Sequence, residues 1–173
     1  MNAPTWECAK RLLADCDGAA TEIFVVGLSL PRLPVVVAAL SELPLLEVTS
    51  FGDEMLECPE PFDAIWRSRL ESIPSHGCQH ALRSAEHTER HLQIHLWVDV
   101  KSTTITVELV FWNDRAFPWN LAAAEKEQRL KALVSLAEAC RTGVLGAQCI
   151  LTPEHNGPTE ELLERRAEDV IVW

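Results

Sequence analysis

Hydrophobic and polar residues alternate most regularly in the middle of the chain. From His91 to Val100 every second residue is apolar, and the alternation returns from Thr103 to Trp112. Such a pattern is typical of β-strands with one buried face. Because a slip of one residue would break every apolar pair, the sequence predicts a hairpin with a single register. The expected partners are Val98 with Ile105, Leu96 with Val107, Ile94 with Leu109 and Leu92 with Phe111.

The turn of this hairpin falls at Lys101-Ser102, and this pair is a poor two-residue turn. We therefore expect a wider loop that keeps the same pairing. Elsewhere, apolar spacing predicts helices over 5–15, 29–43, 62–73, 121–141 and 159–167, and strands over 22–29, 45–51, 144–151 and 170–173. Segments 52–61 and 113–120 are expected to be loops, 74–83 is expected to be irregular, and 84–90 shows neither pattern.

This order of elements predicts an α+β fold. We expect a single domain over residues 1–173, with a mainly antiparallel sheet, the central hairpin 91–100/103–112 and helices packed on the sheet. The strand-helix-strand unit from Glu22 to Phe51 permits a parallel pair of strands without requiring one.

Length and composition are those of a globular protein. The chain has 173 residues, 47% of them hydrophobic and 24% charged. The first residues lack the apolar run of a secretory signal, and the longest apolar run, Leu33 to Leu40, is too short to span a bilayer. The six cysteines, at positions 8, 16, 58, 78, 140 and 149, form no CxxC pair, which favours reduced thiols. We expect a soluble, cytoplasmic protein.

Charge is distributed unevenly. The net charge is -11 and no cluster of Lys and Arg exists, so nucleic acid is a poor partner. Between Leu33 and Trp66 there are seven acidic residues and no basic one. The densest part, Asp53 to Asp63, is expected to be a loop that also carries apolar residues. Such a loop suits a basic protein surface, although a solvated loop without a partner is the alternative.

Two tryptophans extend the candidate binding surface. Trp97 and Trp112 project from the polar face of the predicted hairpin, and tryptophan is enriched at interaction sites. The alternative is that a helix covers this face. The full set of predicted partner-binding residues is Asp53, Glu54, Met55, Glu57, Glu60, Asp63, Trp97 and Trp112.

Histidines and cysteines provide the second candidate chemistry. One group has the spacing H-x-C-x-H at His76, Cys78 and His80, and another spaces His87, His91 and His95 by four. Three imidazoles on one helix face would suit zinc, but the predicted strand interrupts that helix near His91. The hairpin register places His95 opposite Glu108, as a cross-strand pair. No nucleophile elbow, glycine-rich phosphate loop or catalytic cysteine signature occurs, so neither enzymatic activity nor a cofactor is expected.

Three segments resemble small bacterial immunity proteins, the antidotes of polymorphic or type VI secretion toxins. They are the strand-helix-strand unit Glu22–Phe51, the segment VELVFWNDRAFP from Val107 to Pro118, and DVIVW from Asp169 to Trp173. The resemblance implies a stoichiometric inhibitor that binds a cognate toxin and occludes its active site without turnover. It also implies a partner with a basic surface, because such inhibitors are often acidic.

The sequence therefore leaves three functions open. The first is a non-catalytic, cytoplasmic protein-binding inhibitor of the immunity type. The second is a metal-binding protein or metal-dependent enzyme that uses His76, Cys78, His80, His91 or His95. The third is a structural or assembly subunit with the tryptophan face as its interface. The oligomeric state does not follow from the sequence.

Overall fold

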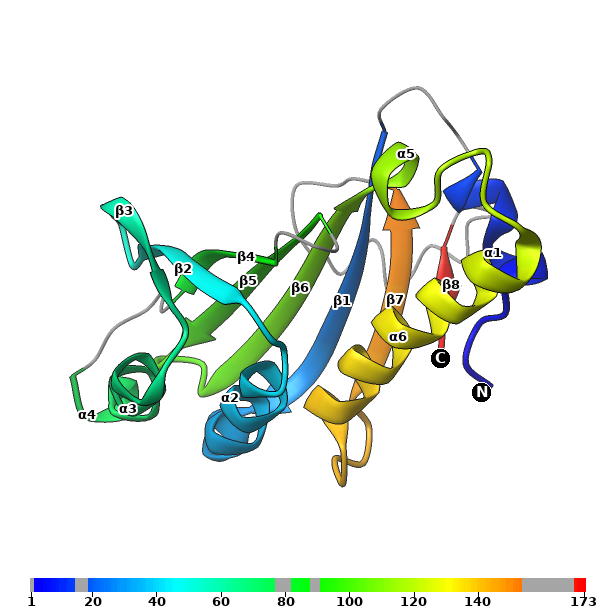
Figure 1. The fold of residues 1–173 in the computed structure, drawn as a ribbon. Coiled ribbons are helices and arrows are strands. Elements are labelled where there is room, and N and C mark those ends of the chain that lie inside the picture. Colours follow the sequence, from blue (N-terminus) through cyan, green and yellow to red (C-terminus); the bar gives the residue numbers. More distant parts are fainter. Residues whose placement is uncertain (1, 15–18, 77–81, 88–90, 154–169) are drawn as a thin grey trace.

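The protein has an α+β fold, as the sequence predicts. The computed structural model describes residues 2–14, 19–76, 82–87, 91–153 and 170–173. Within these ranges eight strands form one antiparallel sheet in the order β3-β2-β4-β5-β6-β1-β7-β8 (Figure 1). The strands are β1 Ala20–Ser29, β2 Leu46–Phe51, β3 Glu54–Pro61, β4 Leu82–His87, β5 Leu92–Asp99, β6 Thr104–Trp112, β7 Gln148–Pro153 and β8 Ile171–Val172.

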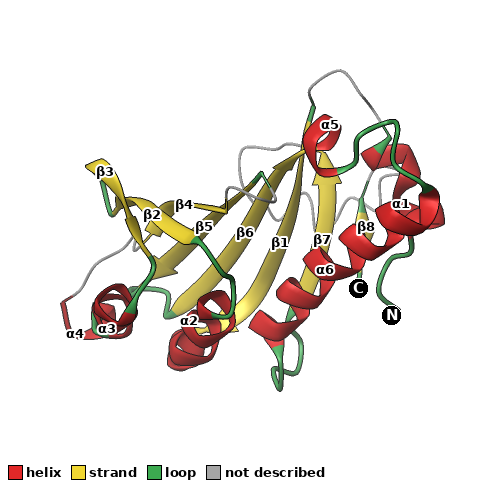
Figure 2. Cartoon of the chain, viewed as in Figure 1, coloured by secondary structure: helices red, strands yellow, loops and turns green. Residues whose placement is uncertain are grey.

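The longer helices lie across one face of the sheet. Figure 2 shows α2, α3 and α6 in front of the strands. The helices are α1 Trp6–Leu13, the 3-10 helix η1 Leu30–Arg32, α2 Leu33–Ser41, α3 Ala64–Glu71, α4 Ile73–His76, α5 Asn113–Ala116 and α6 Ala123–Arg141. None of the described helices is long and apolar enough to cross a membrane.

The central hairpin of β5 and β6 has the predicted register. All four predicted apolar pairs form, from Leu92 with Phe111 to Val98 with Ile105. The loop spans residues 100–103 and is wider than two residues, as expected. Asp99 organises this loop, since its carboxylate accepts hydrogen bonds from the Lys101 and Ser102 backbone and from the Ser102 hydroxyl. The Ser102 hydroxyl bond, followed by the backbone bonds, lowers the pKa of Asp99 below its ordinary value of 3.8.

The core lies between the sheet and its helices. The apolar residues of β5 and β6 that face the helices are buried, as are Ile23 and Val25 of β1. The long helix α6 contributes the apolar stripe that its sequence predicts, and all five members are buried: Leu130, Leu133, Val134, Ala137 and Cys140. Gly143, just beyond this helix, has a φ of 73°, which glycine adopts without strain.

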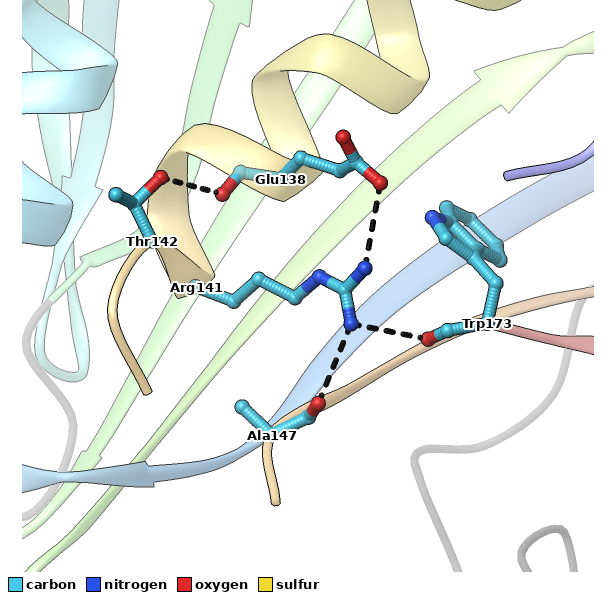
Figure 3. A network of polar contacts seen from close by, with 5 residues as sticks. All are labelled: Glu138, Arg141, Thr142, Ala147 and Trp173. Atoms are coloured by element: carbon cyan, nitrogen blue, oxygen red, sulfur yellow. Dashed lines mark hydrogen bonds and ion pairs between the residues drawn. The ribbon is translucent and has the colours of Figure 1, made fainter. Parts of the chain in front are cut away.

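Polar contacts hold the end of α6 against the last two strands (Figure 3). The Arg141 guanidinium donates to the Glu138 carboxylate at 3.2 Å, to the Ala147 carbonyl at 3.4 Å and to the Trp173 carbonyl at 3.2 Å. The Thr142 hydroxyl donates to the Glu138 carbonyl at 3.0 Å. Arg141 thereby connects the helix, the loop before β7 and the segment that follows β8.

Four predictions about single elements are corrected. The predicted loop 52–61 is strand β3 from Glu54 to Pro61, because an edge strand tolerates the prolines and glutamates that argued against a strand. Segment 74–83 is not wholly irregular, since α4 extends to His76 and β4 begins at Leu82. The predicted loop 113–120 begins with the short helix α5. The segment predicted as a strand over 144–151 becomes β7 only at Gln148, after a turn with positive φ at Gly146.

The strand-helix-strand unit does not form a neighbouring pair. Strands β1 and β2 are separated in the sheet by β4, β5 and β6. The helix predicted over 29–43 is divided into η1 and α2, and Ser29 makes no side-chain capping bond. The helix predicted over 159–167 lies outside the described residues.

Candidate protein-interaction site

Most of the predicted acidic residues lie on one hairpin at an edge of the sheet. We call residues 46–61, which comprise β2, a turn and β3, the acidic hairpin (Figure 1). It contains five acidic residues and no Lys or Arg. The turn includes Gly52, whose φ of 60° suits glycine. The strands pair at both ends of β3, at Phe51 with Glu54 and at Val48 with Glu60, and the register shifts between these points.

Two of the predicted binding residues, Asp63 and Glu60, make hydrogen bonds that stabilise the fold. Asp63 caps α3, because its carboxylate accepts hydrogen bonds from the backbone N–H groups of Ile65 at 2.8 Å and Trp66 at 3.2 Å. The Glu60 carboxylate accepts a hydrogen bond at 3.0 Å from the indole N–H of Trp66, whose side chain is buried. Glu60 therefore links the acidic hairpin to α3, Asp63 caps the start of that helix, and both carboxylates have partners within the protein.

Two glutamates and a methionine form the accessible part of the acidic hairpin. Glu54 and Glu57 are exposed, and within the described part of the chain they have no hydrogen bond or ion pair. Met55 is 74% exposed, between these two glutamates. Asp53 is exposed in the turn beside them. This arrangement combines negative charge with an apolar side chain, which are the two components expected of a surface that meets a basic protein.

The cations nearest in sequence are occupied by other contacts. Arg67 of α3 pairs with Glu71 at 3.1 Å. The Arg69 guanidinium lies over the rings of Phe51, at 5.2 Å, and Trp66, at 4.9 Å. Both arginines therefore contact residues of α3 or β2. Among the described residues, neither is paired with Glu54 or Glu57, whose negative charge can interact with a partner.

The open edge of β3 is poorly suited to pairing with another strand. Pro59 and Pro61 have no backbone N–H, and residues of the same strand are charged. Proline and charge are common means of preventing edge-to-edge association. A partner would therefore meet the side chains of the acidic hairpin, and strand addition would be disfavoured.

The second face of the sheet holds a polar cluster. The register places His95 opposite Glu108, as predicted, and the two side chains are 2.9 Å apart at Nδ1 and Oε2. The Trp97 indole N–H donates to the same oxygen at 2.8 Å. The same carboxylate oxygen therefore contacts both the His95 ring and the Trp97 indole. Glu108 is 5% exposed, so its carboxylate is satisfied inside the protein.

Neither predicted tryptophan is an open anchor. Trp97 is half-buried and its N–H is engaged by Glu108. Trp112 is half-buried as well, and the Arg115 guanidinium lies over its ring at 5.7 Å. Phe24, which pairs with Glu108 in the sheet, is fully buried. The structure thus does not bring the tryptophans and the acidic residues into one surface.

The histidine candidates are only partly described. Cys78 and His80 lie outside the described residues, and so does the side chain of His76. His91 is exposed in a turn with a φ of 47°, and His95 is engaged by Glu108. Among the described residues, no group of three or more His, Cys, Asp or Glu side chains could hold a metal ion.

The cysteines that the structure describes are free thiols. Cys8 and Cys58 are exposed, whereas Cys140 and Cys149 are buried. Burial, with a contribution from the neighbouring Cys149, raises the pKa of Cys140 to about 12. Burial raises the pKa of Cys149 to about 11, against the opposing effect of Arg141. Both buried thiols therefore remain protonated at neutral pH and are poor nucleophiles.

One exposed tryptophan was not predicted as a binding residue. Trp119 is 82% exposed in the loop between α5 and α6, and it is the most exposed aromatic residue in the described part of the chain. No periodic pattern surrounds it, so the sequence offers only one signal, a bulky apolar residue between Pro118 and Asn120 in a loop.

Comparisons with protein-family models, with curated proteins and with solved structures find no match for this chain.

Proposed function

We propose that this protein is a non-catalytic binding protein that engages a basic protein partner through the acidic hairpin. Its mode of action would be that of a small immunity protein, which occludes the active site of a cognate toxin domain. The observation that carries the proposal is the acidic hairpin itself, in which Glu54, Met55 and Glu57 are exposed without a neighbouring cation in the hairpin.

Charge and shape of the hairpin both support this function. Uncompensated negative charge at an edge raises the rate at which a basic partner is encountered. Met55 supplies apolar surface that desolvates on contact, and its flexible thioether adapts to an irregular pocket. The contacts of Glu60 and Asp63 with α3 hold the hairpin in place before a partner arrives. A surface that is ordered in advance loses less entropy on binding.

Within this proposal the predicted binding residues have different roles. Glu54, Met55 and Glu57, together with Asp53, remain candidates for direct contact. Glu60 and Asp63 act as supports of the hairpin. Trp97 and Trp112 belong to a different face, so the proposed binding surface does not include them. No described feature favours the metal-binding alternative over this proposal.

The first experiment is co-purification with the product of the adjacent gene, tested as the candidate toxin, followed by association kinetics. We expect a stable complex and protection of cells from the toxin. For the double variant Glu54→Gln/Glu57→Gln, we expect association to slow roughly threefold to tenfold at low salt, with little difference from the original protein at high salt.

A matched control separates local charge from net charge. The double variant Glu7→Gln/Asp114→Asn changes the net charge equally, at exposed positions away from the acidic hairpin. It should leave the association rate nearly unchanged. Absence of any complex and of any protection would overturn the proposed function, whereas equal slowing by both double variants would overturn the assignment of the surface.

A further inference from the structure

Trp119 lies in a loop that is held by a hydrogen-bonded turn and by the buried side chain of Phe117. The Leu121 N–H donates to the Pro118 carbonyl at 3.0 Å, which closes a turn with Trp119 at its second position. Before this turn, the buried Phe117 ring lies 5.3 Å from Trp6 and 5.8 Å from Phe111. The loop cannot swing to cover the indole without losing these contacts. Burial of an exposed tryptophan on a fixed loop therefore costs little entropy, as in many binding hot spots.

The segments around Trp119 carry more basic than acidic residues, although the protein as a whole is acidic. We call α1 together with residues 113–131, which comprise α5, the Trp119 loop and the first half of α6, the basic end. It contains six basic and four acidic residues, a net charge of +2, while the whole chain carries -11. Lys10 pairs with Glu7 and Lys131 with Glu127 inside this surface, so the positive excess comes from Arg11, Arg115, Lys126 and Arg129. Contacts hold the basic end together, because the Trp6 N–H donates to Glu127 and the Arg129 guanidinium donates to the Ala116 carbonyl.

The acidic hairpin and the basic end lie at opposite sides of the molecule. The hairpin forms the β3 edge of the sheet, whereas α1 and the start of α6 lie on the side of β7 and β8 (Figure 1). Seven strand spacings separate the two edges, a width of about 30 Å. The hairpin has a net charge of -5 and an exposed Met55, while the basic end has a net charge of +2 and an exposed Trp119. Each surface thus carries a charge and an apolar side chain that complement the other.

We propose that the basic end, which includes the exposed Trp119, docks the acidic hairpin of a second copy of this chain. The two surfaces differ and lie on opposite sides, so they cannot meet within one molecule, and association between copies is head to tail. We assign a second copy as the partner because its acidic hairpin carries the negative charge that complements the positive charge of the basic end. This inference does not depend on the proposed function. If both hold, copies and the basic partner compete for the acidic hairpin.

Sedimentation velocity of the full chain over a range of concentrations tests the proposal. At low salt we expect the weight-average sedimentation coefficient to rise with concentration, and at high salt we expect it to fall to the monomer value. A monomer at every concentration in low salt would overturn the proposal. No toxin is present in this experiment, so a monomeric result does not contradict the proposed function. Likewise, failure to bind a toxin would not contradict self-association.

Two variants remove one surface each. Trp119→Ala removes the anchor of the basic end, and Glu54→Lys/Glu57→Lys reverses the exposed charge of the acidic hairpin. We expect each variant alone to sediment as a monomer, with an unchanged circular dichroism spectrum. The control Leu145→Ala, at another fully exposed apolar side chain, should associate like the original protein. Association that persists in both variants would contradict the inference.

Mixing the two variants tests the head-to-tail geometry. The Trp119→Ala protein retains an intact acidic hairpin, and the hairpin variant retains an intact basic end. One complementary interface can therefore form between them, and the mixture should give a dimer that grows no further. If association depended on like surfaces meeting, the variant that retains that surface would still associate on its own. That result, or a mixture that stays monomeric, would overturn the head-to-tail arrangement.

Discussion

The central hairpin and the acidic hairpin have the same antiparallel backbone arrangement and opposite surface chemistry. In β5 and β6 one face is wholly apolar and buried, and both strands have neighbours on either side. In β3 no residue is buried, and β2 is the strand's single neighbour among the described residues. The difference shows that the position of a hairpin within the sheet decides whether its side chains are buried or exposed. Neighbours on both sides require apolar side chains, whereas an edge leaves residues available to a partner.

The largest expected difference between the two hairpins is in how much stability each loses when one apolar side chain is truncated. Leu109→Ala leaves a cavity in the core and should lower the free energy of unfolding by about 2–5 kcal/mol. Met55→Ala, at an exposed position, should change it by less than about 0.5 kcal/mol. Chemical denaturation of both variants measures the contrast. Similar losses in the two variants would show that the acidic hairpin is part of the cooperative core.

A smaller effect is expected from the polar cluster of the central hairpin. Glu108→Ala removes the carboxylate that contacts the His95 ring and accepts the bond from the Trp97 N–H, and an unpaired buried donor costs about 1–3 kcal/mol. Glu57→Ala in the acidic hairpin is the matched comparison and should be nearly neutral. Thermal unfolding of both variants at pH 7 provides the measurement. A stable Glu108→Ala protein would mean that other groups satisfy this donor.

The smallest effect concerns the turn of the central hairpin. The pKa of Asp99 is lowered in the folded protein, so its charged form contributes stability above the ordinary pKa of 3.8. That contribution is lost as the pH falls through the lowered value. Asp99→Ala should therefore reduce the unfolding temperature slightly at neutral pH, with a difference that shrinks below about pH 4.

Ser102→Ala provides a second measurement on the same turn. Its hydroxyl is the largest cause of the lowered pKa, so this variant should reproduce part of the loss at neutral pH. A difference between Asp99→Ala and the original protein that stays constant down to strongly acidic pH would rule out the charge of Asp99 as the source.

The sequence predicts the central hairpin well because its signal is local. Two alternating strands lie next to each other in the chain, and their apolar residues match in one register alone. Strand β3 is missed because Pro59, Pro61 and three glutamates lower strand propensity, and its pairing is tolerated only at an edge. The separation of β1 from β2 also escapes prediction, since it depends on three strands that come later in the chain.

The candidate site is predicted in part. Clustering of negative charge is visible in the sequence, so Glu54, Met55 and Glu57 are candidates before the fold is known, and the structure adds that all three are exposed. The supporting roles of Glu60 and Asp63 depend on where α3 places Trp66, which no local pattern specifies. Burial around Trp97 likewise depends on contacts across the sheet. An isolated exposed residue such as Trp119 has no periodic signal, and its exposure follows from the loop geometry alone.

The place of β1 in the sheet has a consequence for protein synthesis. This strand is made early, yet both of its neighbours come late: Ile23 pairs with Leu109, about 90 residues further on, and with Leu151, about 130 residues further on. Until those segments leave the ribosome, the apolar run Ile23-Phe24-Val25 has no strand to pair with. An unpaired apolar strand is prone to aggregation. Until both segments have been synthesised, the nascent chain therefore carries an apolar strand that needs protection.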